Sequence, residues 1–343
     1  RLRPLAPVPY GDGRDTRAHA AVRFDEASLL ADPEPVCDAV LWHLGEPGLT
    51  RLQVLRAMQE GAAARPAPGV VLPDGGWVAL RSPQLEVFLD AGPHAALSGA
   101  HAHADALAIE VSVRGRVVLA DPGTFRYMGP GRDALRRTAV HNAVTVGDHS
   151  SATPAGPFRW AAAPVTRITA APCDAAPLFA QAHHDGFAAQ GVARTHREIR
   201  LLREDALLIF DWVSGVPTEP IAVHWRPPAG VRAEVREDDL CLVDDAAAGV
   251  RAPVLATIVI PADWQAVTTT APHSPGYGVC DEVVGFTCHP RDAATTACCT
   301  LLLTGPIDAT AVLSPLADTG AAVPAWRLQG GDLDCTVTPA SFR

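Results

Sequence analysis

Short runs of β-forming residues separated by turns dominate the chain from about residue 70 to its end. Apolar and β-branched side chains gather in these runs, and turn signals such as Asp74-Gly75-Gly76 and Arg114-Gly115 separate them. The predicted strands cover residues 76–80, 85–89, 107–113, 117–119, 143–146, 198–202, 206–213, 254–260 and 300–303. Because no helical segments alternate with these strands, the pattern predicts a large antiparallel β-sandwich and disfavours a doubly wound parallel sheet.

The segment before these strands has helical spacing instead. Apolar residues recur at helix-like intervals over residues 24–60, with Gly45, Pro47 and Gly48 expected to end a first helix. A second helix is predicted over residues 50–59 with Thr50 as its N-cap, and residues 62–69 read as a linker. Two short helices cannot bury a core of their own, so we expect them to pack against another part of the protein.

Charge and hydropathy exclude two classes of partner. The chain has 343 residues, of which 48% are hydrophobic and 19% charged, and its net charge is −10. No dense basic run is present, which argues against a nucleic-acid binder. No apolar run is long enough for insertion into a membrane. A polyanionic sugar needs only a local group of arginines and therefore stays a candidate partner.

The segment GAHAHAD at residues 99–105 carries the strongest chemical signal. Alternate side chains of an extended strand share one face, so His101, His103 and Asp105 are expected to point the same way. Asp121, in a DPGT turn, and His141 follow along the chain. An imidazole pair with a carboxylate and a third imidazole from nearby strands favours a site for Zn²⁺ or a similar ion.

Each of these residues also has a plainer interpretation. Asp105 can orient a histidine by hydrogen bonding, Asp121 can cap its turn, and a single histidine such as His141 carries little information. Other owners of an HxH pair fit less well. Metallo-β-lactamase-like hydrolases continue to HxHxDH, where this chain has Ala106, and amidohydrolase barrels need helices between their strands. The eight cysteines include no CxxC pair, which disfavours a zinc ribbon.

Arg126, Arg132, Arg136 and Arg137 form a cationic stretch in an otherwise acidic chain. Guanidinium groups pair well with carboxylate and sulfate groups. Any one of these arginines is more simply interpreted as part of a solvated loop, but together they are candidate contacts for an acidic ligand.

Several motifs, taken in order, resemble the heparinase II/III-like family of polysaccharide lyases. The matching stretches are PDGGWVALR at 73–81, DAGP at 90–93, GAHAHAD at 99–105, DPGTFRY at 121–127 and RRTAVHN at 136–142. Residues 195–197, 210–215 and 223–225 are also similar. Each motif is weak alone, but the ordered set is specific and covers roughly residues 70–230.

The resemblance implies a mainly β fold with two parts. Residues 66–343 would form a large antiparallel β-sandwich, or supersandwich. Residues 1–65 would hold a few helices from the end of an α/α-toroid, followed by a linker. The implied reaction removes the C5 proton of a uronic acid and expels the 4-linked oxygen. This is a β-elimination on an acidic polysaccharide such as heparin, heparan sulfate or alginate.

The resemblance also assigns roles to single residues. His101 resembles the catalytic base or acid of the family, and Tyr127 is a second proton-transfer candidate. His103, Asp121 and His141 resemble its metal ligands, so one divalent ion is expected, zinc first and calcium as the alternative. The candidate substrate contacts are Arg126, Arg136 and Arg137.

Further expectations concern the setting of the chain. An anionic polysaccharide is the expected partner, a homodimer is a candidate assembly, and the expected location is periplasmic or secreted. In the family, a tyrosine and an asparagine or histidine from the toroid complete the site. We expect most of the toroid to be missing here, so the chain alone can lack full activity. The alternatives are a non-catalytic carbohydrate-binding sandwich with a structural metal and a metal-dependent hydrolase.

Overall fold

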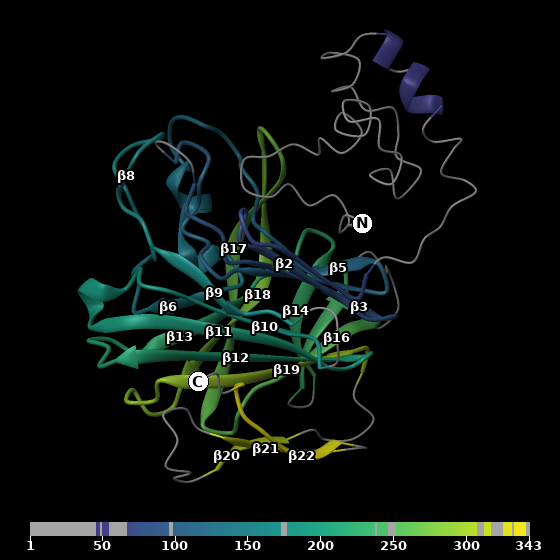
Figure 1. Ribbon diagram of the computed structural model, residues 1–343, viewed down its shortest axis with the longest axis vertical. Helices are drawn as coiled ribbons and strands as arrows, with labels where there is room; N and C mark the ends of the chain where they lie inside the picture. Colours follow the sequence, from purple (N-terminus) through teal and green to yellow (C-terminus); the bar gives the residue numbers. More distant parts are fainter. Residues whose placement is uncertain are drawn as a thin grey trace.

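Strands make up most of the computed structural model (Figure 1). The residues that the structure describes are 46–48, 50–54, 67–95, 99–172, 177–236, 239–245, 252–306, 312–316, 325–330 and 333–340. The predicted helix before residue 45 and most of the predicted linker lie outside these residues.

The first sheet is an antiparallel meander. Its strands, in both chain and spatial order, are β1 (Gly69–Leu72), β2 (Trp77–Arg81), β3 (Leu85–Asp90), β4 (Ile109–Val113) and β5 (Arg116–Leu119). Leu85, Val87 and Leu89 are fully buried, whereas the residues between them are not, so β3 turns every second side chain into the core. Positive φ angles at Arg114 (50°) and Gly115 (81°) give the tight turn between β4 and β5.

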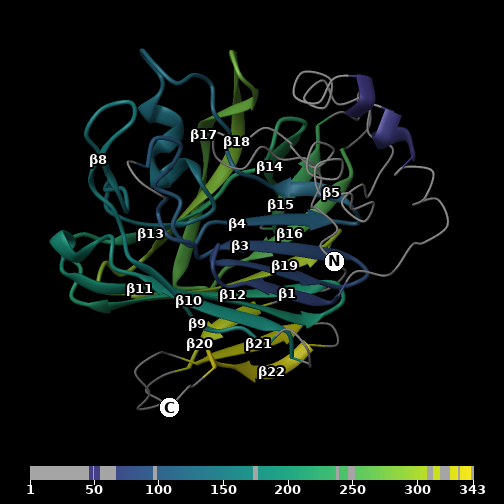
Figure 2. The same cartoon turned by 45° about the horizontal axis from the view of Figure 1, so that its top comes forward.

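An eight-stranded antiparallel sheet forms the second layer. Its strands, in spatial order, are β14 (Val231–Arg236), β15 (Asp239–Asp244), β16 (Val254–Val259), β19 (Ala297–Thr304), β12 (Ala206–Gly215), β11 (Val192–Arg203), β10 (Phe179–His184) and β9 (Thr166–Ala170). Figure 2 shows β3 and β4 running across this layer near β12 and β19.

A four-stranded sheet closes one side of the sandwich. It consists of β17 (Trp264–Gly276), β18 (Val279–Pro290), β13 (Ile221–Trp225) and β6 (Val144–Val146), in that order. Side chains from this sheet, from the meander and from the eight-stranded sheet share one buried apolar cluster, which includes Val87, Ile209 and Phe286. The three sheets therefore form one core.

Smaller elements complete the fold. Strands β20 (Val312–Pro315), β21 (Trp326–Gly330) and β22 (Leu333–Val337) form a sheet at the bottom of Figure 1. This sheet packs Leu313, Trp326 and Leu328 against the outward side chains Leu208 and Phe210 of β12. Strands β7 (Thr153–Pro154) and β8 (Trp160–Ala162) pair with each other. The 3₁₀ helices are η2 (Asp133–Arg136), η3 (Thr138–Val140) and η4 (Ala188–Gln190).

The predicted fold class is confirmed: the described chain is an antiparallel β-sandwich. The predicted helix boundaries before the sandwich differ from the structure. Residues 46–48 and 50–54 are helical, so Pro47 and Gly48 do not end a helix as predicted. The Thr50 hydroxyl donates to the Glu46 carbonyl oxygen (3.1 Å), one turn back, and does not cap the helix. Among the described residues, no helix combines the length and apolar character needed to cross a bilayer.

Candidate active site

The HxH segment is a loop, and the predicted extended strand is wrong. Residues 101–105 lie in the connection between β3 and β4, outside any strand. The loop is held by backbone hydrogen bonds from Ala102 N to Gly99 O (3.0 Å) and from Ala104 N to Arg136 O (2.9 Å). Gly99 has a left-handed φ of 67°, and Leu107 one of 62°, so the chain bends at both ends of the segment. A continuous extended strand cannot include these two left-handed residues.

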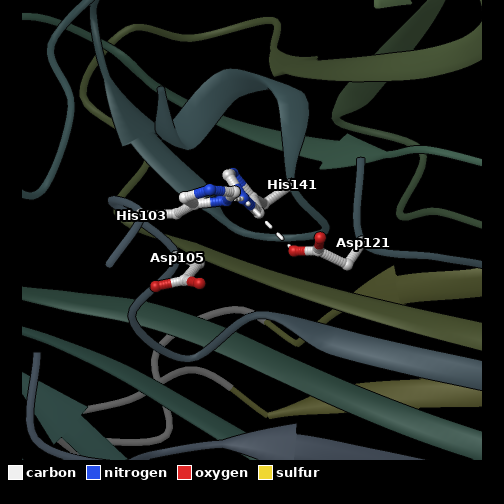
Figure 3. A group of neighbouring side chains, drawn as sticks. All are labelled: His103, Asp105, Asp121 and His141. Atoms are coloured by element: carbon white, nitrogen blue, oxygen red, sulfur yellow. Dashed lines mark hydrogen bonds and ion pairs between the residues drawn. The ribbon is translucent and has the colours of Figure 1, made fainter. Parts of the chain in front are cut away.

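This loop nevertheless brings the predicted ligands together. His103, Asp105, Asp121 and His141 each offer one ligand atom, and these atoms lie within 4.8 Å of one another (Figure 3). His103 and His141 are 1% and 0% exposed and Asp121 is 5% exposed, whereas Asp105 is half-buried. His103 and Asp105 come from the loop before β4. Asp121 is the second residue after β5, and His141 directly follows η3.

The distances inside this cluster suit a small divalent ion. His103 Nδ1 lies 3.3 Å from His141 Nε2, and His141 Nε2 lies 3.4 Å from Asp121 Oδ2. Ligands about 2.0–2.1 Å from a tetrahedral zinc ion stand about 3.3–3.4 Å apart, which these spacings match. Asp105, interpreted from the sequence as an orienting residue or as a neighbour of the ligands, lies among the donors. The chemistry of two imidazoles with carboxylates therefore fits the predicted ion.

Each predicted ligand is oriented by its other polar atom. His141 Nδ1 donates to the Arg137 carbonyl oxygen (2.8 Å), so the neutral ring presents Nε2 to the cluster. His103 Nε2 lies 3.3 Å from Thr124 Oγ1, which leaves Nδ1 for the cluster. Asp121 Oδ1 accepts from Gly123 N (2.7 Å), and Oδ2 faces His141. These side chains therefore already point their ligand atoms at one another, and no change of rotamer is needed to form the cluster.

Gly123 is required in the turn that carries Asp121. Its φ is 72°, and a Cβ atom there would lie 2.2 Å from the Ser274 carbonyl oxygen. Ser274 N in turn donates to Pro122 O (2.7 Å), and Gly278 N to Phe125 O (2.8 Å). The β17–β18 hairpin therefore packs directly on the turn and fixes its position.

The cluster has the electrostatics of a cation site. Burial, together with the charge of the Asp90 carboxylate, raises the pKa of Asp105 to about 8. Burial by itself also raises the pKa of Asp121. The hydrogen bond and charge of His141 outweigh that effect and hold the Asp121 pKa below its usual value. Burial lowers the pKa of His141, but Asp121 raises it to a net increase. Buried carboxylates that repel each other in this way are relieved by a cation.

A cleft of about 240 Å³ opens over this cluster. Its walls include His103 and Asp105 from the cluster, His101 beside them, and Trp77, Asp90, His94, Pro164 and Thr166 from other segments. His101 is exposed, and its ring meets the ring of Tyr127 edge-on at a centroid distance of 5.4 Å. The two predicted proton-transfer residues are therefore neighbours, and His101 is the one that lines the cleft.

The predicted substrate arginines differ in position. Arg137 is exposed, and Arg126 is half-buried with its guanidinium 3.9 Å from the centre of the Phe125 ring. Arg136 is 1% exposed. It pairs with Asp133 (2.9 Å) and lies over the Trp160 ring (4.2 Å). Arg136 is therefore placed to brace the loops, whereas Arg126 and Arg137 lie where a ligand can reach them.

Two residues that support the site had no role assigned from the sequence. Asn142 is 1% exposed. It donates to the carbonyl oxygens of Ile109 (2.9 Å) and Ala120 (3.0 Å) and accepts from Arg226 N (2.6 Å). Asn142 thereby joins β4, the end of β5 and the segment after β13 directly beside His141. The one indication of this role in the sequence was that Asn142 lies in the motif at residues 136–142, which resembles a motif of the family.

Arg197 is the second supporting residue. Its guanidinium forms a bidentate pair with Asp211 (2.7 and 3.0 Å) and also donates to the carbonyl oxygens of Leu107 and Asn142. All of these groups are buried. The eight-stranded sheet is thereby tied to the two loops that carry the histidines. Arg197 and Asp211 both lie in stretches that resemble the family, which was the signal available for them.

Fold and site together define a β-sandwich protein with a buried histidine and carboxylate centre beneath a cleft. The family model described as "Heparinase II/III-like, C-terminal" matches residues 64–278, more than half of the sequence. The chain belongs to this family, as the sequence motifs indicated.

Solved structures share the fold. A heparan sulfate lyase HepC mutant from Pedobacter heparinus is 15% identical with a TM-score of 0.68, over 96% of this chain and 50% of that one. A heparinase III structure is 14% identical with a TM-score of 0.65, over 88% of this chain and 48% of that one. The chain therefore spans about half the length of the solved lyases it matches. No curated protein gave a significant match.

Proposed function

We propose that the chain is the β-sandwich part of a lyase that cleaves polysaccharides containing uronic acid by β-elimination. The observation that carries this proposal is the exposed His101, with Tyr127 against it, at a cleft over the buried histidine and aspartate cluster. Two further observations support the proposal: the chain belongs to the heparinase II/III-like family, and it shares its fold with a solved heparan sulfate lyase. Heparin, heparan sulfate or an alginate-like polymer is the proposed substrate class.

We infer that His103, Asp121 and His141, with Asp105 as a further donor, would hold one divalent ion. Two imidazole donors favour zinc, because calcium prefers a shell made of oxygen atoms only. When bound, such an ion would act as a Lewis acid near the cleft and tie together the loops before β4 and after β5. No other part of the proposed chemistry depends on it.

The chemistry requires two proton transfers and a place for a carboxylate. One group takes the proton from C5, the electron pair forms the C4–C5 double bond, the C4–O bond breaks, and the leaving oxygen takes a proton. His101, which lines the cleft, and Tyr127, whose ring contacts that of His101, are suited to take the first proton and supply the second. Arg126 and Arg137 are suited to pair with carboxylate or sulfate groups of the polymer.

A direct test is the ultraviolet absorbance of unsaturated uronate, measured with the full-length protein on a panel of uronic acid polymers. We expect His101→Ala to abolish turnover while the melting temperature stays within about 2 °C, because the residue is exposed. His149→Ala is the matched control, since it removes another exposed histidine, paired with Glu219, outside the cleft lining. Normal turnover of His101→Ala would reject its catalytic role.

A carbohydrate-binding sandwich without catalysis is the second candidate. It is favoured by the burial of the cluster, which suits a structural ion. This candidate predicts glycan binding without an unsaturated product. It also predicts that removing the metal lowers the melting temperature and changes no reaction rate.

The periplasmic or secreted location and the homodimer stay predictions, to be checked by fractionation and by sedimentation.

A further inference from the structure

A row of four side chains crosses strands β9 to β12 of the eight-stranded sheet. Arg167 pairs with His183 in register, His183 with His196, and His196 with Trp212. The four strands lie side by side (Figure 1). With strands about 4.8 Å apart, three steps make the row roughly 14 Å long. We call these four residues the Arg-His-His-Trp row.

Neighbouring rings of the row contact each other, and all four members remain open to solvent. The rings of His196 and Trp212 are stacked, with a centroid distance of 4.8 Å and an interplanar angle of 2°. The ring centroids of His183 and His196 are 5.5 Å apart. His183, His196 and Trp212 are half-buried, and Arg167 is exposed. The row is therefore an ordered strip of surface.

The neighbouring row along the same strands is covered by the C-terminal segment of the described chain. Gln181 donates to the Ala340 carbonyl oxygen (3.2 Å), Ala340 N donates to Glu198 (2.8 Å), and Arg200 donates to the Thr338 carbonyl oxygen (3.1 Å). Gln181 and Glu198 stand two residues from His183 and His196, on the same face of the sheet. The exposed row therefore begins where this cover ends.

Charge decides what kind of ligand suits the row. Two facing imidazoles could in principle hold a metal ion. However, Arg194 and Arg167 are exposed and close enough to His183 to add to burial in lowering its pKa. The Asp185 carboxylate raises the His183 pKa, but by less than either arginine lowers it. Two fixed positive charges disfavour a cation and attract carboxylate or sulfate groups. Trp212 adds a ring against which the apolar face of a sugar can pack.

The row also begins at the edge of the cleft. Thr166, the first residue of β9, lines the cleft beneath which His103 and Asp105 lie, and Arg167 is the next residue. Since β9 is the edge strand of its sheet, a polymer that leaves the cleft across this edge meets Arg167 first and then His183. Because neighbouring residues of a strand point to opposite faces, Thr166 faces the cleft and Arg167 the outer face of the sheet, so the cleft and the row meet at this edge strand.

We propose that the Arg-His-His-Trp row, together with Arg194, is a second binding site for an anionic saccharide. Carboxylate or sulfate groups pair with the two arginines and with imidazole N–H groups, and a sugar ring packs against Trp212. The choice of a saccharide over a free anion rests on the proposed function.

The test measures binding of a heparin hexasaccharide to the chain at low salt, with inorganic sulfate and a neutral cello-oligosaccharide of equal length as separate arms. We expect hexasaccharide binding to weaken by about tenfold in the double variant Arg167→Gln, Arg194→Gln, which loses two charge contacts on exposed side chains. Arg203→Gln is the matched control, because Arg203 is an exposed arginine on the same strand as Arg194. The imidazole resonances of His183 and His196 should shift on binding.

The outcomes separate this inference from the proposed function. Unchanged hexasaccharide affinity in the double variant, or shifts confined to His94 and His101 at the cleft, would refute the row and leave the lyase proposal standing. Equal shifts with sulfate alone would refute the saccharide assignment. Binding at the row by a full-length protein that forms no unsaturated product from any polymer of the panel would overturn the lyase proposal and leave the row in place.

Discussion

Tyr127 is the residue on which the proposed proton transfers depend most after His101. Its ring stands edge-on to His101 at 5.4 Å, a contact that phenylalanine can keep. We therefore expect Tyr127→Phe to fold normally and to lower turnover by roughly 10²–10⁴-fold, the usual effect of losing a proton-transfer group. The measurement is the rate of unsaturated product formation beside the melting temperature. Unchanged turnover would make Tyr127 a packing residue only.

Asn142 shows how a buried amide can support a neighbouring ligand. Asn142→Ala leaves the Ile109 and Ala120 carbonyl oxygens and Arg226 N without their partner, all in buried surroundings. We expect a loss of about 2–5 kcal/mol in the free energy of unfolding. Metal affinity should also fall, because Asn142 directly follows the ligand His141 and helps to fix its backbone. Denaturant titration and metal titration check the two effects, and a change below about 1 kcal/mol would contradict this role.

Elements were more predictable from the sequence than loops. The predicted strands 85–89 and 206–213 correspond to Leu85–Asp90 and Ala206–Gly215, because alternating or continuous apolar runs and turn residues determine a strand locally. Residues 101–105 have the alternation of a strand but form a loop, since their geometry depends on partners distant in sequence, such as Arg136. The predicted ligands converge all the same. The position of Arg197 depends on the same kind of distant contacts, with Leu107 and Asn142, so its role was not predictable.

Strand β10 carries a buried histidine that should make the sheet sensitive to acid. Burial lowers the pKa of His184 to about 3, and the Arg197 charge contributes to the lowering. The unfolded chain, with a histidine pKa near 6.5, binds the extra proton first, so stability is lost as the pH falls from about 6.5 toward 3. Asn in place of His184 can still accept the Gly186 N–H, as Nδ1 does at 3.0 Å.

His184→Asn should therefore reduce the slope of unfolding free energy against pH in this window by up to about 1.4 kcal/mol per pH unit. Urea titrations of both proteins at several pH values between about 4 and 7 provide the comparison. Parallel slopes would mean that His184 is not buried in its neutral form.

At the scale of the whole molecule, the proposed metal site connects separate loops of one core. The four donors come from three separate parts of the sequence, at residues 103–105, 121 and 141, so an ion bound there would stabilise the folded state alone. Binding at 1,000 times its dissociation constant adds about 4 kcal/mol. We expect a chelator to lower the melting temperature by several degrees in the unchanged chain and to have no effect on His103→Ala. An equal effect on both proteins would place the ion elsewhere.

The central claim, that this sandwich serves a β-elimination, is tested most directly by digesting a uronic acid polymer in water labelled with heavy oxygen. Elimination breaks the C4–O bond without adding water, so the account predicts products that are unsaturated and, when reduced with borohydride before the new reducing end exchanges its oxygen, carry no label from the solvent. Products that contain one labelled oxygen for each cut and have no double bond would show hydrolysis and contradict the account.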